Sequence, residues 1–98
     1  MFVEDNSYYK MLTSDKFIEH LNYLIKRANN INEIYVLKFI DIEKSETKII
    51  YLSSITASEY LKFTTLLFDS IYDNDFMLCV IETTYPDCSR HSTVYCVK

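Results

Sequence analysis

The sequence predicts an α+β domain in which two αββ units form one mainly antiparallel four-stranded sheet with two helices packed on it. Two amphipathic segments carry helix-start signals, and each is followed by two runs rich in β-forming residues. A constant shift aligns Ser14 with Ser58 and Val36 with Val80, so the order α-β-β-α-β-β indicates a repeated unit. We therefore expect a single domain over residues 1–98, with an internal αββ duplication of residues 14–52 and 58–97.

The first helix is predicted over residues 14–28. Ser14 can cap its N-terminus, and apolar residues from Phe17 to Ala28 then recur at a period of 3.6 residues. Asn29 or Asn30 is expected to end the helix in the left-handed conformation, because the chain contains no glycine.

Two strands are predicted next, over residues 33–42 and 47–52. Both runs are rich in Ile, Tyr, Val and Thr, which are the residues typical of strands. The polar segment from Glu43 to Glu46 is short enough to join them as a hairpin.

The second helix is predicted over residues 57–72 and has the clearer start signal. Thr56-x-x-Glu59 matches a capping box, and Ile55 and Tyr60 occupy the two positions of a hydrophobic staple. Strands at 76–84 and 92–97 follow, and Pro86 favours a turn over Tyr85–Cys88. The predicted core is Leu21, Leu24, Val36, Ile40, Leu67, Phe68, Leu78 and Val80.

The central predicted strands are apolar on both faces, and two helices cover only one face of a sheet well. In residues 34–42, one face carries Ile34, Val36, Ile40 and Ile42, and the other carries Tyr35, Leu37 and Phe39. Two arrangements would bury both faces: the N-terminal segment packs over the second face, or the helices lie on opposite faces. Otherwise the face with Tyr35, Leu37 and Phe39 is exposed, and a second copy of the chain or another protein covers it.

The absence of glycine excludes several catalytic motifs. Phosphate-binding loops, dinucleotide fingerprints and nucleophile elbows need glycine where the backbone approaches a ligand or takes a positive φ. The chain supplies no replacement motif, so we expect a protein that is not an enzyme and that needs no cofactor or metal.

Charge and composition indicate the compartment and limit the partners. The net charge is −4 and basic residues are scattered, which argues against direct nucleic-acid binding. No apolar run approaches the length of a membrane span, and three cysteines without a CxxC pair suit a reducing compartment. We expect a cytoplasmic protein. Abundant Ile, Asn, Lys and Tyr are typical of AT-rich genomes such as those of many phages and viruses, in which case the location is the host cytoplasm.

Three chemical alternatives were weighed against this interpretation. Cys88 and His91 supply the groups of a small thiol-dependent or redox-sensitive protein. Cys79 and Cys96 with them supply the ligand types of a zinc site, although strand spacing keeps these residues apart. A sheet that stacks RNA bases is the third alternative, and its aromatic side chains would be Tyr35, Phe39, Tyr51 and Tyr95.

The second predicted helix carries acidic residues where the helix dipole disfavours them. Asp69, Asp73 and Asp75 lie near its C-terminal end, and Glu59 lies on the same helix. They either stop a helix without glycine or form a surface that meets a basic patch or a basic nucleic-acid-binding groove on another protein. The function predicted is a small protein-binding module, an accessory protein of a phage or virus that inhibits a host or defence protein through an acidic and aromatic surface.

Overall fold

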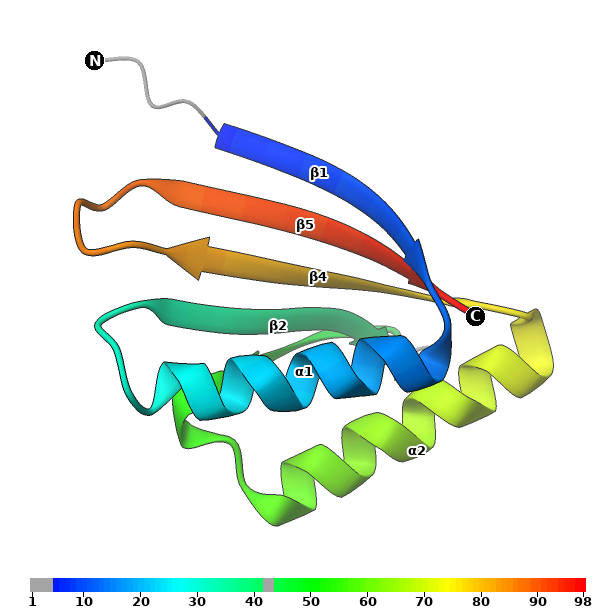
Figure 1. Cartoon of the computed structure of the whole chain (residues 1–98). Coiled ribbons are helices and arrows are strands. Elements are labelled where there is room, and N and C mark those ends of the chain that lie inside the picture. The colour runs from blue at the N-terminus through cyan, green and yellow to red at the C-terminus, as the bar shows by residue number, and fades with distance from the viewer. Residues whose placement is uncertain (1–4, 42–43) are drawn as a thin grey trace.

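The computed structural model describes residues 5–41 and 44–98 and shows an α+β architecture with five strands and two helices (Figure 1). The order α-β-β-α-β-β is present and is preceded by one further strand. The elements are β1 (Asp5–Leu12), α1 (Ser14–Ala28), β2 (Ile34–Asp41), β3 (Glu46–Tyr51), the 3-10 turn η1 (Leu52–Ser54), α2 (Ala57–Asn74), β4 (Met77–Thr84) and β5 (Arg90–Val97).

The strands form one mixed sheet in the order β1-β5-β4-β2-β3. The pairs β2–β3, β2–β4 and β4–β5 are antiparallel, and β1 runs parallel to β5. The prediction of four strands is therefore wrong in number, because residues 5–12 add a fifth strand at the edge. Tyr8, Lys10 and Leu12 alternate with Tyr9 and Met11 in this strand, a pattern that fits a half-covered edge.

Backbone hydrogen bonds fix β1 at its end. The Lys98 N–H donates to the Leu12 carbonyl over 2.9 Å, and the Ser14 N–H donates to the Lys98 carbonyl over 2.7 Å. The chain thus turns directly from the edge strand into α1 beside the end of β5.

Both helices pack on the same face of the sheet (Figure 1). Phe63 of α2 contacts Phe39 of β2 with ring centroids 4.9 Å apart, and Phe17 of α1 contacts Tyr95 of β5 with centroids 5.2 Å apart. Neither arrangement that would bury both faces occurs: the helices are not on opposite faces, and the described part of the N-terminal segment extends the sheet.

Half of the predicted core is correct. Leu21, Leu24 and Leu67 are buried between the helices and the sheet. Val36 is also buried, although it lies on the face without helices.

The other half of the predicted core is wrong, because the helices cover the opposite face of the central strands. Ile40 and Leu78 are 60% and 49% exposed, and Val80 is only half-buried. Phe68 lies on the outer side of α2 and is 48% exposed.

At both ends of α1, side chains satisfy backbone groups in a chain that has no glycine. Thr13, one residue before the predicted Ser14, caps α1 by accepting the Lys16 N–H. The side-chain amides of Asn29 and Asn30 donate to carbonyls of the last turn, so neither needs the predicted left-handed conformation.

The capping box of α2 is confirmed. The Glu59 N–H donates to the Thr56 hydroxyl, and the Thr56 N–H donates to the Glu59 carboxylate, each over 3.0 Å. At the other end Asp75 is left-handed with φ 70°, and its N–H donates to the Ile71 carbonyl. The predicted turn at Pro86 is also present, since the Cys88 N–H donates to the Tyr85 carbonyl.

Candidate functional site

The largest candidate site is the sheet face that carries no helix within the described ranges, which we call the open face. Strand registers place the side chains of alternate residues from all five strands on it. Its described residues are Tyr9, Met11, Ile34, Val36, Lys38, Ile40, Thr47, Ile49, Tyr51, Leu78, Val80, Glu82, Thr84, Arg90, Ser92, Val94 and Cys96.

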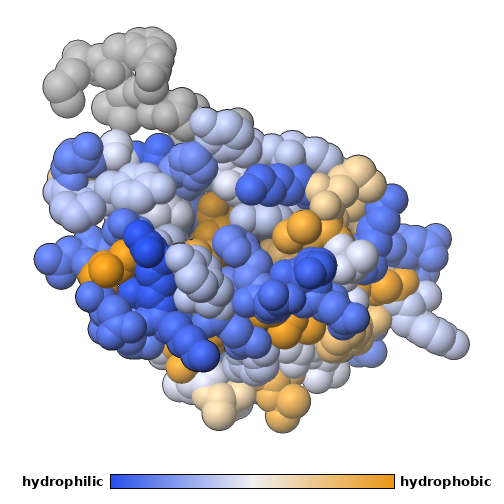
Figure 2. Space-filling model, viewed as in Figure 1, coloured by the Kyte–Doolittle hydropathy of each residue, from blue (hydrophilic) through white to orange (hydrophobic). Residues whose placement is uncertain are grey.

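The open face is apolar and accessible. Ile40, Ile49, Leu78, Tyr9 and Met11 are each about half exposed or more, and they come from four different strands. The side on which the helices lie is largely hydrophilic with several hydrophobic patches (Figure 2). Exposed apolar side chains of this number on one face of a sheet mark a surface that is normally covered.

One ion pair interrupts the apolar surface near its centre. Lys38 Nζ lies 2.8 Å from the Glu82 carboxylate, on adjacent strands β2 and β4. Both side chains are partly buried, which makes the pair less screened than one in open solvent.

The predicted exposure of Tyr35, Leu37 and Phe39 is wrong. These residues occupy the face of β2 under the helices and belong to the core. The side chains of β2 alternate as expected, but the helices cover the face opposite to the expected one, because both faces are apolar and the local sequence does not show which one is covered.

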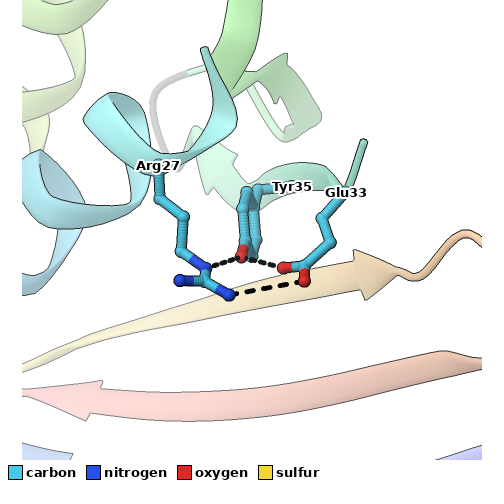
Figure 3. Close-up of polar contacts among 3 residues, drawn as sticks. All are labelled: Arg27, Glu33 and Tyr35. Carbon is cyan, nitrogen blue, oxygen red and sulfur yellow. Dashed lines mark hydrogen bonds and ion pairs between the residues drawn. The ribbon is translucent and has the colours of Figure 1, made fainter. Parts of the chain in front are cut away.

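Tyr35 nevertheless takes part in a polar cluster at the edge of the core (Figure 3). Arg27 Nε donates to the Tyr35 hydroxyl over 3.0 Å, that hydroxyl donates to Glu33, and Arg27 Nη2 lies 3.4 Å from the Glu33 carboxylate. Burial and the Glu33 carboxylate raise the pKa of Tyr35 to about 12. The hydroxyl of Tyr35 and the charge of Arg27 lower the pKa of Glu33. The cluster ties the end of α1 to the start of β2.

The acidic residues of α2 divide between structural roles and surface roles. Glu59 belongs to the capping box at the start of α2, and Asp75 provides the left-handed residue after its end. Asp69 and Asp73 are exposed, and no hydrogen bond or ion pair occupies them among the described residues.

Apolar residues lie beside these two carboxylates. Leu61, Phe68 and Tyr72 follow one another at helical spacing on the outer side of α2, and Tyr72 is 89% exposed. We call Leu61, Phe68, Asp69, Tyr72 and Asp73 the acidic-aromatic stripe. The spacing was visible in the sequence, but Phe68 was assigned to the core, so the stripe was missed.

The cysteine alternatives are not assembled by the fold. Cys79 points to the helix side of the sheet and Cys96 to the open face, so they cannot share one metal ion. Burial raises the pKa of Cys79 to about 12, which disfavours its thiolate. Cys88 is exposed in the hairpin turn, whereas the His91 ring stacks on Tyr8 with centroids 4.7 Å apart.

A groove on the helix side was also missed by sequence reasoning. It runs between α1 and strands β1 and β5, and includes cavities of about 220 Å³ and 410 Å³ that share Lys10, His20, Tyr23 and Tyr95. These residues come from three separate elements, and no spacing in the sequence connects them.

No protein-family model, curated protein or solved structure matches this chain. Neither helix of the described structure is long and apolar enough to cross a membrane. Function is therefore argued from the surfaces of the molecule.

Proposed function

We propose that the protein acts by binding other protein chains and not by catalysis, and that a second copy of itself occupies the open face. The single observation that carries this proposal is the set of exposed apolar side chains that four of the five strands place on the open face. Covering such a face is strongly favourable, since each Å² of apolar surface removed from water contributes about 25 cal/mol.

The dimensions of the open face fit a dimer interface. Five strands about 4.8 Å apart, four of eight residues and one of six, give a face of about 24 Å by roughly 20 to 26 Å. Side-chain relief raises the accessible area of such a face toward the ~800 Å² per partner of a standard interface. Two twisted sheets can pack face to face in this way as a β-sandwich with its helices outside.

The charges on the open face favour a symmetric partner. Lys38 and Glu82 lie side by side near its centre, so a two-fold axis between them places each Lys38 opposite Glu82 of the second copy. The four charges would then satisfy one another in the apolar interface, which fixes the register of the two sheets.

The test is the mass of the protein in solution with Leu78 replaced by Glu. The wild type is expected to be dimeric at micromolar concentration by sedimentation or light scattering. Leu78→Glu should weaken association on the order of 100-fold, because two desolvated carboxylates would enter the interface. Circular dichroism should show a folded chain, since Leu78 is half exposed in the single chain.

Leu61→Glu is the matched control, because Leu61 is also an exposed leucine but lies on α2. It should leave the dimer intact. A wild type that stays monomeric at about 100 μM, or equal dissociation by both variants, contradicts the proposed dimer.

The acidic-aromatic stripe supports a second binding function for a different partner. Phe68 and Tyr72 are exposed beside Asp69 and Asp73, and α2 stays on the outside when the open face is covered. A basic protein surface with apolar residues is complementary to this stripe. Occupying such a surface is how an accessory protein of phage or viral origin would inhibit a host protein.

A Lys- and Leu-rich amphipathic peptide provides a direct probe of the stripe. Asp69→Asn with Asp73→Asn should weaken its binding at low salt by roughly fivefold, because two charges are lost, and should flatten the salt dependence. Asp15→Asn on α1 is the control and should have no effect. Unchanged affinity in the double variant would rule out the stripe.

A further inference from the structure

The helix-side groove brings together several basic side chains in a protein that is acidic overall. Lys10, His20, Arg27 and His91 all line its 220 Å³ cavity, although the chain carries a net charge of −4. No carboxylate lines this 220 Å³ cavity among residues 5–41 and 44–98, whereas Glu19 lines the adjoining 410 Å³ cavity together with Lys16. Basic side chains are therefore concentrated in this cavity although the chain is acidic overall, which points to an anionic occupant.

The basic side chains of the cavity differ in whether another side chain of the protein already pairs with them. Arg27 pairs with Glu33 and donates to Tyr35, so its role there is partly structural. Lys10 is exposed and forms no ion pair within the described residues. His20 is half-buried, and its Nε2 lies 3.1 Å from the Tyr95 hydroxyl. Lys10 is thus the unpaired charge among the described residues that is available to an anion, and His20 beside it adds a charge only when its imidazole is protonated.

The bottom of the cavity supplies hydroxyl groups. Thr83 of β4 and Thr93 of β5 lie on neighbouring strands, and both are buried on the helix side of the sheet. With the hydroxyl of Tyr95 they form a polar base under the cationic side chains. Hydroxyls can turn to donate hydrogen bonds to anionic oxygens.

The opening of the cavity is aromatic. The His91 ring stacks on Tyr8 with centroids 4.7 Å apart, and Tyr85 meets it edge-on with centroids 6.5 Å apart. Tyr23 lines the opposite side from α1. Flat π-faces of this kind stack on planar rings.

We infer that this groove binds a small anion that carries a planar ring, with its anionic group at Lys10 and His20 and its ring between the aromatic side chains. The 220 Å³ cavity adjoins the 410 Å³ cavity through Lys10, His20, Tyr23 and Tyr95, which provides the space of an ordinary ligand pocket. The groove lies on the helix side, so it stays open when a second copy covers the open face.

The titration of His20 gives an independent readout. Burial and, to a lesser extent, the charge of Lys10 lower the pKa of His20. The other titratable groups lining the 220 Å³ cavity are Arg27, Tyr23, Tyr35, Tyr85, His91 and Tyr95, and Lys16 and Glu19 line the adjoining cavity together with His20. An anion bound near His20 stabilises its imidazolium, so the pKa of His20 should rise on binding.

Adenosine monophosphate, adenosine and inorganic phosphate are suitable probes, followed by NMR of the histidine ring protons. The monophosphate should shift the signals of both His20 and His91 saturably and raise the pKa of His20. Adenosine and phosphate should each bind at least fivefold more weakly, because each lacks one of the two recognised groups. No saturable shift at about 10 mM monophosphate, or equal binding by either fragment, overturns the inference.

Charge variants locate the anionic group. Lys10 is exposed, so Lys10→Gln should leave the fold intact. The variant should weaken binding of the monophosphate roughly fivefold to tenfold. Lys26→Gln is the matched control, because Lys26 lies on α1 but lines neither cavity. Equal weakening by both variants would show only a general effect of net charge and would overturn the assigned site.

Discussion

Replacing Leu37 by Glu is expected to prevent stable folding. Leu37 is completely buried on the helix side of β2, in the core that contains Phe17 and Phe63. The substitution loses about 2–5 kcal/mol of apolar packing and adds several kcal/mol for a buried carboxylate. Together these costs are comparable with the whole stability of a small domain, about 5–15 kcal/mol.

Circular dichroism and urea titration of Leu37→Glu measure this loss directly. Leu78→Glu on the neighbouring strand is the internal control, because it makes the same substitution on the other face of the sheet. It should fold and lose only self-association. If Leu37→Glu folded and Leu78→Glu did not, the helices would have to cover the opposite face.

Phe63→Ala is expected to destabilise the protein by about 3–5 kcal/mol. Phe63 is fully buried and joins both helices to the sheet, with ring centroids 6.1 Å from Phe17 and 4.9 Å from Phe39. Removal of its ring leaves a cavity that three packed elements cannot all close.

Urea unfolding of Phe63→Ala should show a lower midpoint with a similar slope. Phe68→Ala lies on the same helix and removes the same ring from the outer side, so it should cost less than about 1 kcal/mol. Similar losses in the two variants would contradict the orientation of α2.

The features that sequence analysis predicted correctly are mostly local. The capping box of α2 depends on Thr56 and Glu59, three residues apart, and the turn after β4 depends on Pro86. Both helices and the four strands of the αββ units follow from periodicity over short segments. In each case the residues that determine the element lie within it.

The face of the sheet could not be predicted in this way. Ile40 and Phe39 alternate on β2 and are equally apolar, so only the packing of α1 and α2 decides which is buried. The edge strand β1 was missed for a related reason: its partner β5 lies at the other end of the sequence.

The candidate sites also differ in whether their residues lie close together in the sequence. The sequence indicated Asp69 and Asp73, and it could indicate them because both lie on one helix. The pocket around Lys10 and His20 brings together residues from β1, α1, β2, β4 and β5, and its chemistry exists only after folding. The role of Asp75 also becomes clear only from the backbone conformation. Its left-handed φ ends α2 and explains this residue without a ligand.

The parallel pairing of β1 with β5 has a consequence for the order in which the chain folds. Asp5 pairs with Arg90 and Leu12 with Val97, so β1 cannot pair in the sheet until β5, far later in the sequence, has been synthesised. Such distant pairing raises contact order and slows folding. Until β5 leaves the ribosome, both β1 and the matching edge of β4 are unpaired strands, and nascent chains in that state are prone to pair with one another.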